Sequence, residues 1–231
     1  VNIMEDFFNP GVSRPMVEFF HDEPLITLSP VPGTAFQLMF KRLIDIAASL
    51  FIIVAFAPVF ILIAILIKST SRGPVVFKQM RSGLNGRIFN LYKFRSMYSD
   101  AEERMKEIRK LNEQEEPVFK IRNDPRITRV GRVLRKLSLD ELPQLFNVLG
   151  GTMSLVGPRP LPVYETEQFE KRWQKRRLSM KPGITCLWQI SGRNQIQFDD
   201  WMKLDMKYID NWSLGLDIVI LFKTVPAVLF A

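Results

Sequence analysis

The sequence feature that most constrains the fold is an uncharged, apolar run that covers residues 46–67. As a helix, its 22 residues would measure about 33 Å, which is enough to cross the hydrocarbon core of a bilayer. Pro58 lies near the middle and has no amide hydrogen for a helical hydrogen bond, so we expect a bend there. Basic residues flank the run on both sides: Lys41, Arg42, Lys68 and Arg72. A spanning helix normally has lysines and arginines mostly on one side, so residues 36–72 are predicted to form a re-entrant membrane segment.

The residues before this segment differ from the rest of the chain. Residues 1–35 contain five prolines and mostly acidic charges. Because proline at this density interrupts helices and sheets, we expect a linker, with a strand or short helix near residues 16–20. The chain starts at Val1 rather than at Met, so we expect the linker to follow an N-terminal region that this sequence lacks.

The remaining residues, 73–231, are predicted to form a mostly helical domain of the α+β class. Residues 75–94 consist of two strand-like runs around Asn85-Gly86, which is a strong signal for a β-hairpin. Residues 99–116 have the mixed charge and thin apolar stripe of a solvated helix that ends before a proline.

Two further segments are candidates for contact with a membrane surface. Residues 164–180 form a predicted amphipathic helix whose basic residues surround Trp173, a pattern typical of a helix that lies on anionic headgroups. The alternative is a surface helix with one partly buried tryptophan. Residues 205–231 end in an apolar run that Lys223 and Pro226 interrupt, so we expect a short helix packed on the domain or dipping into the interface.

The charge balance restricts the class of partner. The formal net charge of +8 indicates nucleic acid, anionic lipid or a phosphorylated substrate. Cys186 is the single cysteine and His21 the single histidine, which excludes an intrachain disulfide and a zinc site built on these residue types. No helix-turn-helix, zinc-finger or RNA-binding pattern accompanies the basic residues, so we expect no nucleic-acid partner.

The candidate active site lies within residues 120–160. Ser138, followed by Glu141 and an apolar run, predicts a capping box that places Asp140 and Glu141 in the first turn of a helix. Basic residues surround this pair in the sequence: Arg126, Arg129, Arg132, Arg135 and the rigid Gly157-Pro158-Arg159-Pro160. Two adjacent carboxylates between guanidinium groups suit a magnesium ion and a polyphosphate. The alternative is structural, with Glu141 completing the cap and Asp140 solvated.

Other polar residues are candidates for substrate contact. Lys93 and Arg95 end the predicted hairpin, either as solvated charges or as phosphate contacts. The glycines within residues 181–193 permit the close approach of a ligand to the backbone. Gln189 and Arg193 in this segment are therefore candidate contacts to a nucleotide.

Six short motifs occur in one order: KFRSM (93–97), NDPRIT (123–128), SLDELPQL (138–145), SLVGPRP (154–160), KPGIT-LWQ-SGR (181–193) and D-x-x-YIDNWSL-LDI (205–218). Together they closely resemble the bacterial sugar transferases, the polyprenyl-phosphate sugar-1-phosphate transferases with one membrane-embedded helix. The resemblance covers Gln37 to Ala231. The family often breaks its re-entrant helix at Ser-Pro, whereas here Ala57 precedes Pro58, and it usually has Gly where this chain has Cys186.

This resemblance implies transfer of a sugar 1-phosphate from a UDP-sugar to polyprenyl (undecaprenyl) phosphate, with release of UMP, at the start of exopolysaccharide, capsule or O-antigen assembly. Asp140 would attack phosphorus and form an aspartyl-phosphosugar, and Glu141, together with Asp140, would hold Mg²⁺. The candidate substrate- and phosphate-binding residues are Arg135, Arg159, Lys93, Arg95, Arg126, Gln189 and Arg193. The catalytic domain would lie on the cytoplasmic face of the bacterial inner membrane, in contact with its lipids.

One other class of function stays open, that of a membrane-anchored assembly protein without chemistry. In such a protein the carboxylate pair between arginines would have no role. Release of a uridine nucleotide from a nucleotide sugar separates the two classes. The identity of the sugar and the presence of a homo-oligomer cannot be read from the residues.

Overall fold

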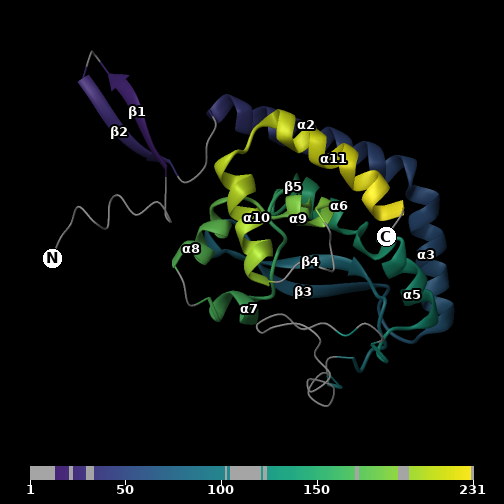
Figure 1. The fold of residues 1–231 in the computed structure, drawn as a ribbon. Coiled ribbons are helices and arrows are strands. Elements are labelled where there is room, and N and C mark those ends of the chain that lie inside the picture. Colours follow the sequence, from purple (N-terminus) through teal and green to yellow (C-terminus); the bar gives the residue numbers. More distant parts are fainter. Residues whose placement is uncertain are drawn as a thin grey trace.

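The computed structural model describes residues 14–20, 23–29, 34–101, 103–104, 121, 124–169, 172–191 and 198–229 (Figure 1). The fold is of the predicted α+β class and mostly helical, with two-stranded sheets among the helices. Most of the polar helix predicted over residues 99–116 lies outside the described residues.

β1 (Arg14–Phe20) and β2 (Glu23–Ser29) form an antiparallel hairpin within the segment predicted as a linker. The strand expected near residues 16–20 is confirmed, whereas β2 was not predicted. Pro24 in β2 pairs with Phe19 in a sheet of two strands, where both strands are edges and proline is tolerated. The prolines of this segment therefore did not prevent it from forming a two-stranded sheet.

α2 (Ala35–Ala55) and α3 (Ala57–Thr70) form the apolar segment and meet at a 62° bend. Pro58 lies in the first turn of α3, where its missing amide hydrogen costs no helical hydrogen bond, so the predicted break is confirmed. α2 begins well before the apolar run because Thr34 and Gln37 form a capping box. In the described part of the chain, no single helix has the length and apolar character to cross a membrane, whereas this bent pair has them jointly.

In α2 the polar side chains are buried and the apolar side chains are exposed, which is the reverse of the pattern expected of a helix on a soluble domain. Its buried side chains are Lys41, Asp45 and Ser49, which lie four residues apart on one face. Lys41 forms an ion pair with Asp217, and Asp45 accepts the N–H of Leu155 at 2.9 Å. The exposed face is apolar and includes Phe36, Met39, Leu43, Leu50, Phe51 and Val54.

β3 (Val76–Ser82) and β4 (Ile88–Phe94) form the predicted antiparallel hairpin. Its loop contains Asn85 at φ 54° and Gly86 at φ 75°, the left-handed conformation that Asn and Gly adopt most readily. The turn signal is confirmed, but the loop covers residues 83–87 and is longer than the two-residue loop that Asn-Gly most often forms.

β5 (Ser154–Val156) and β6 (Gly183–Thr185) pair in parallel at the centre of the fold. Gly157 and Gly183 let these segments approach each other, since a Cβ on either one would collide with the backbone of the other segment. The main core packs around them and includes Val148, Met153, Tyr208, Ile209 and Ile220.

After β6, the described part of the chain forms α9 (Leu187–Ile190), α10 (Phe198–Asp210) and α11 (Leu214–Leu229). α11 confirms the expected C-terminal helix packed on the domain, where it lies beside α2 (Figure 1) and buries Ile220. Pro226 lies inside α11 without ending it. The exposed face of α11 is apolar and includes Ile218, Val219, Phe222 and Val225.

The single helix predicted over residues 164–180 is wrong. The structure has three short elements there: α7 (Val163–Glu167), α8 (Arg172–Lys175) and a 3-10 turn, η4 (Arg176–Ser179). Arg176 and Arg177 are buried and pair with Asp210 and Asp205 of α10, so they do not face lipid headgroups. The tryptophan of this segment packs, partly buried, against the core, as the alternative reading expected.

Candidate active site

Asp140 and Glu141 lie in a short turn rather than at the start of an α-helix. Three elements form this region: α5 (Arg129–Lys136), the 3-10 turn η3 (Leu139–Glu141) and α6 (Gln144–Leu149). The predicted capping box is wrong, because Ser138 is left-handed at φ 54° and its side chain makes no capping hydrogen bond. Its N–H instead donates to the carbonyl O of Arg135 at the end of α5. Neighbouring side chains, rather than a helix dipole, therefore set the charge state of the carboxyl groups.

Glu141 is held by two cations from distant parts of the chain. Lys93 Nζ on β4 donates to Glu141 Oε1 at 2.7 Å, and Arg159 Nη2 donates to the same oxygen at 3.3 Å. Burial alone raises the pKa of Glu141, but the charges of Lys93 and Arg159 outweigh burial and lower the pKa to about 2. Glu141 is therefore an anion at neutral pH, and no side chain in the described part of the chain donates a hydrogen bond to its Oε2.

Asp140 differs from its neighbour in its electrostatic environment. Asp140 is buried, with only 6% of its surface exposed to solvent. Burial raises the pKa of Asp140, and the charge of Glu141 adds to this, whereas Lys93 and Arg135 oppose it. A poorly solvated carboxylate is a stronger nucleophile than one in water, because less solvent must be displaced when it attacks. The adjacent carboxyl groups thus have different properties, which is typical of groups with different catalytic roles.

Arg135 and Arg159, both predicted as phosphate contacts, lie close enough to act on the pair. Arg159 contacts Glu141, and Arg135 is fixed by donation from its Nε to Ser96 Oγ at 3.0 Å. Both arginines lower the pKa of Asp140. The predicted bracketing of the carboxylates by arginine is therefore present in the tertiary structure.

Arg81 on β3 is a site residue that sequence reasoning missed. A small hollow beside the pair is lined by Arg81, Leu91, Lys93, Gln144, Arg159, Pro160 and Gly183. Burial, followed by the charge of Arg159, lowers the pKa of Arg81 to about 10, so it is still a cation at neutral pH. The register of the hairpin could have identified Arg81 as a site residue, because in this register Arg81 and Lys93 lie on the same face of the two strands.

Two predicted phosphate contacts are not brought to the pair. Arg95 Nη2 donates to the carbonyl O and to Oγ of Ser71 at 2.8 Å, where α3 ends. Arg126 forms a buried ion pair with Asp124, and its Nη1 donates to Ala101 O at 3.0 Å. These arginines hold the loops that flank the site.

Of the two predicted nucleotide contacts, the structure describes Gln189, which lies in α9. Gln189 is half-buried, and its Oε1 accepts a hydrogen bond from the thiol of Cys186 at 3.1 Å. Arg193 lies outside the described residues. The guanidinium of Arg159 lies 5.8 Å from the ring centroid of Trp188, so this tryptophan contacts the site through an arginine.

The carboxylates fit a hard divalent cation that also binds phosphate. Among the described residues, no group of three or more His, Cys, Asp or Glu side chains could hold a metal ion. Asp140 and Glu141 offer two carboxylates, and Mg²⁺ is commonly bound by one or two carboxylates, substrate phosphates and waters. The ionised Glu141 with its available Oε2 suits this mode of binding.

Comparisons with known proteins identify the family of this chain. The pattern of the family described as "Bacterial sugar transferase" matches residues 36–231. The chain is similar to the galactosyl transferase CpsE of Streptococcus agalactiae, with 46% identity over 224 residues that cover 96% of this chain and 49% of that protein. It is 42% identical to the exopolysaccharide production protein ExoY of Rhizobium meliloti over 91% of this chain and 92% of ExoY.

A third relative is the UDP-glucose:undecaprenyl-phosphate glucose-1-phosphate transferase of Klebsiella pneumoniae, with 38% identity over 95% of this chain and 46% of the relative. The chain thus spans about half the length of CpsE and of the Klebsiella protein, and nearly all of ExoY. The matched residues include the bent helix pair, the hairpin and the acidic pair with its cations. From this agreement over residues 36–231, we conclude that the chain belongs to the bacterial sugar transferase family.

Proposed function

We propose that this chain transfers a sugar 1-phosphate from a UDP-sugar to undecaprenyl phosphate, releases UMP, and so initiates assembly of a surface polysaccharide. The observation that carries the proposal is the pair Asp140 and Glu141, whose pKa values shift in opposite directions beside Lys93 and Arg159. Cations outnumber carboxylates at this site, which suits a diphosphate substrate. The name of the Klebsiella relative describes this reaction with UDP-glucose.

In the first step, a carboxylate oxygen of Asp140 attacks the phosphorus that carries the sugar. A new O–P bond forms, the bond from this phosphorus to the oxygen of UMP breaks, and UMP leaves with the electron pair. Lys93, Arg159 and Arg81, which line one hollow, would hold the phosphate oxygens, whose negative charge otherwise repels the carboxylate. The product of this step is an aspartyl-phosphosugar.

In the second step, a phosphate oxygen of polyprenyl phosphate attacks the same phosphorus. The bond to Asp140 breaks, and its carboxylate is regenerated. Glu141 and Asp140 would hold magnesium together with the phosphates, and when bound the metal supplies charge neutralisation on the phosphate oxygens. Glu141 is suited to this task because it is ionised at every pH above about 2.

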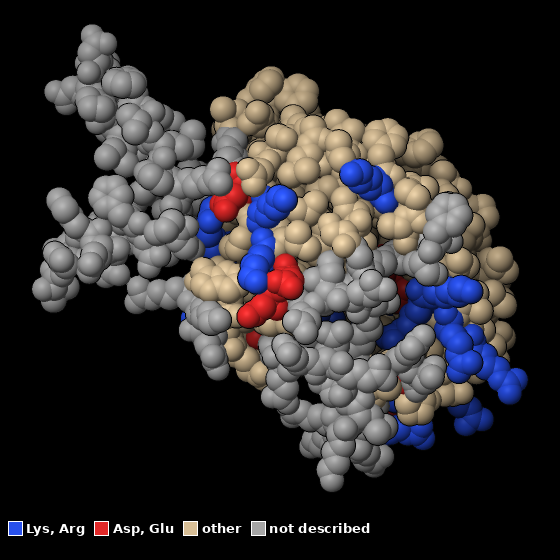
Figure 2. All heavy atoms as spheres, viewed as in Figure 1, with Lys and Arg blue, Asp and Glu red and all other residues tan. Residues whose placement is uncertain are grey.

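We also propose that α2 and α3 form a re-entrant membrane segment that holds the catalytic domain on the cytoplasmic face. Residues 54–58 at the bend are all exposed, and the outer faces of both helices are apolar. The N-terminal part of α2 is tied to the domain by Lys41 and Asp217, and α3 leads directly into β3, so both ends lie on the domain side. Figure 2 shows few charged side chains over α3 and α11 and a group of basic side chains below them.

Product analysis with several UDP-sugars tests the reaction. Purified chain in lipid nanodiscs with undecaprenyl phosphate should release one UMP for each lipid-linked sugar phosphate formed, with at least one UDP-sugar. Release of UDP would mean that the sugar is transferred without its phosphate. No nucleotide release with any UDP-sugar would favour an assembly protein without chemistry.

We expect Phe36 and Thr70, which lie at the two ends of the helix pair, to be on the same side of the membrane. Single cysteines at these exposed positions, in a Cys186→Ser background, should both be protected from an impermeant thiol reagent in intact cells and labelled after lysis. Pro58→Leu restores an amide hydrogen in the middle of the segment, so a fraction of molecules should straighten and expose position 36 outside the cell. Transfer to polyprenyl phosphate should fall in the same proportion.

The control for labelling is Pro74→Leu, which changes a proline outside both helices and should leave both positions protected. Labelling of position 36 alone in intact wild-type cells would establish a true span and contradict re-entry.

A further inference from the structure

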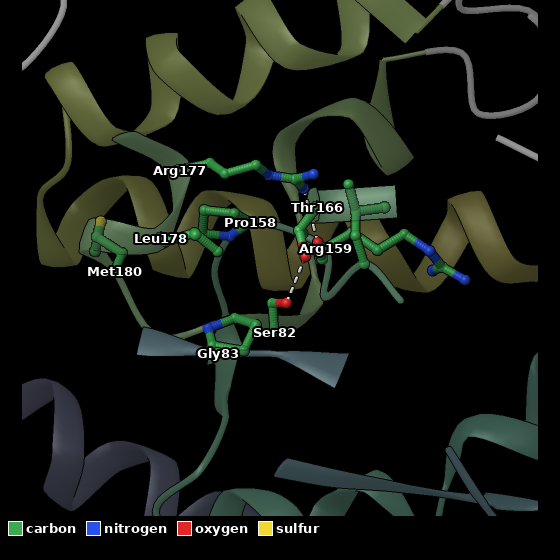
Figure 3. A pocket seen from close by; sticks show the side chains of 10 residues that line it. Ser82, Gly83, Pro158, Arg159, Thr166, Arg177, Leu178 and Met180 are labelled. Atoms are coloured by element: carbon green, nitrogen blue, oxygen red, sulfur yellow. Dashed lines mark hydrogen bonds between the residues drawn. The ribbon is translucent and has the colours of Figure 1, made fainter. Parts of the chain in front are cut away.

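Arg159 is fixed at its backbone as well as at its side chain. Its carbonyl O accepts a hydrogen bond from Arg177 Nη2 at 2.7 Å, which Figure 3 shows beside the pocket that both residues line. Pro158 and Pro160 flank Arg159 and restrict the local backbone torsions. A displacement of this carbonyl therefore moves the whole residue, including the guanidinium that contacts Glu141.

Arg177 is fixed in turn by Asp205 of α10. The same Nη2 donates to Asp205 Oδ2 at 2.7 Å, and the side chains of Arg177 and Asp205 are 2% and 1% exposed. Burial raises the pKa of Asp205 to about 6, against the opposing charge of Arg177. Apolar residues often replace such buried pairs without loss of stability, because the desolvation of two charges offsets their attraction. Stability alone is therefore a weak explanation for this pair.

A second set of contacts joins the two arginines through indole rings. The guanidinium of Arg177 lies 5.3 Å from the ring centroid of Trp201, and the rings of Trp201 and Trp188 lie 4.9 Å apart. The guanidinium of Arg159 lies over Trp188. Arg177 thus acts on Arg159 at two points, directly at its carbonyl O and through two aromatic rings at its guanidinium.

We propose that Arg177, held by Asp205 and by the two indoles, is a positioning residue for Arg159 in the transfer reaction; this role rests on the proposed function. Arg177 is engaged by Asp205 and by the backbone of Arg159, so it acts through Arg159 rather than on the substrate. It determines where the Arg159 guanidinium meets the phosphate. A misplacement of about 1 Å at such a group can lower a rate by about 10²-fold.

The test replaces the buried pair as a unit, with Arg177→Met and Asp205→Leu together, so that no buried charge is left unpaired. We expect kcat for UMP release to fall by roughly 10- to 100-fold, with a much smaller change in the KM for UDP-sugar and in the unfolding temperature. The matched control is Arg176→Met, which removes the neighbouring, partly buried ion pair with Asp210 and leaves the contact to Arg159 intact. Its kcat should stay close to that of the wild type.

A double-mutant cycle separates positioning from general damage to the fold. If Arg177 acts through Arg159, the paired substitution should slow an Arg159→Lys enzyme much less than it slows the wild type. Equal slowing in the two backgrounds, or wild-type kcat in the paired variant, overturns the proposal. If the paired variant does not fold, Trp201→Phe replaces it under the same criterion, since it weakens the indole contact and leaves the ion pair in place. A wild-type enzyme that releases no UMP refutes the proposed function and the positioning role with it.

Discussion

Asp140→Asn is expected to lower transfer of the sugar phosphate by about 10³-fold or more, with the fold intact. An amide cannot attack phosphorus in place of the carboxylate, so the covalent step is lost. Stability should not fall, because burial raises the pKa of Asp140. A carboxyl group with a raised folded-state pKa stabilises the fold at pH values below its unfolded-state pKa, and this stabilisation is lost as the pH rises through the folded-state pKa. Once ionised, Asp140 therefore costs free energy, and Asn removes that cost.

The rate of turnover and mass spectrometry of the covalent intermediate check this prediction. Wild-type protein given UDP-sugar without lipid should carry a phosphosugar on the peptide that contains Asp140, as seen by mass spectrometry, and the Asn variant should carry none. Asp200→Asn is the matched control, since Asp200 is an exposed carboxylate on α10 that pairs with Lys203. Near-normal turnover of Asp140→Asn, or a phosphosugar on another peptide, would show that the nucleophile lies elsewhere.

Glu141→Gln is expected to lower both activity and stability, in contrast to Asp140→Asn. The ordinary pKa of Glu141 is 4.5, and Lys93 and Arg159 lower it to about 2 against the effect of burial. A depressed pKa stabilises the fold above the unfolded-state pKa, and this contribution is lost as the pH falls from about 4.5 through about 2. At neutral pH the contribution is on the order of 3 kcal/mol, and neutral Gln should lose most of it. Chemical denaturation at neutral pH measures the difference between the two variants.

The same substitution tests the proposed metal site. If Glu141 holds magnesium, Glu141→Gln should lower UMP release by roughly 10²-fold and raise the Mg²⁺ concentration needed for half-maximal rate. Excess chelator should abolish UMP release by the wild type, and added Mg²⁺ should restore it. Full activity in chelator would show that the reaction needs no metal. An unchanged Mg²⁺ requirement in the Gln variant would show that Glu141 does not bind the metal.

The features that the sequence predicted well depend on residues close together in the chain. Pro58 within an uncharged run predicted a bent helix pair, because a missing amide hydrogen acts on its own turn. Asn85-Gly86 predicted a hairpin, because these residues adopt left-handed conformations at little cost. The acidic pair close after Arg135 predicted that these charges lie near one another, because η3 is separated from Arg135 by only a few residues.

The capping box shows where a local pattern failed. Ser138 and Glu141 have the right identities and spacing, yet Ser138 adopts a left-handed conformation. Leu134 before it and Leu139 after it pack into the same hydrophobic cluster with α3. The left-handed conformation at Ser138 lets the chain bury Leu134 and partly bury Leu139, and we infer that this packing outweighs a cap worth about 1 kcal/mol.

Register is a second property that the sequence left undetermined. A two-residue turn at Asn85-Gly86 would pair Lys93 with Lys78 and place Arg81 on the opposite face. The longer loop pairs Lys93 with Phe77, so Arg81 and Lys93 share the face toward the site. A shift of one residue moves every side chain of a strand to the other face, which explains why Arg81 was missed.

The sequence by itself determined that this chain has a bent apolar segment, a hairpin, and two adjacent carboxylates with basic residues nearby in the chain. Only the tertiary structure decided which charges meet: Lys41 pairs with Asp217 across 176 positions, and Arg177 with Asp205 across 28. Charges are interchangeable in a sequence pattern, since any Arg or Lys could pair with any Asp or Glu. Their partners are selected when the apolar core closes, because a charge removed from water there must find an opposite charge or a hydrogen-bond partner within reach.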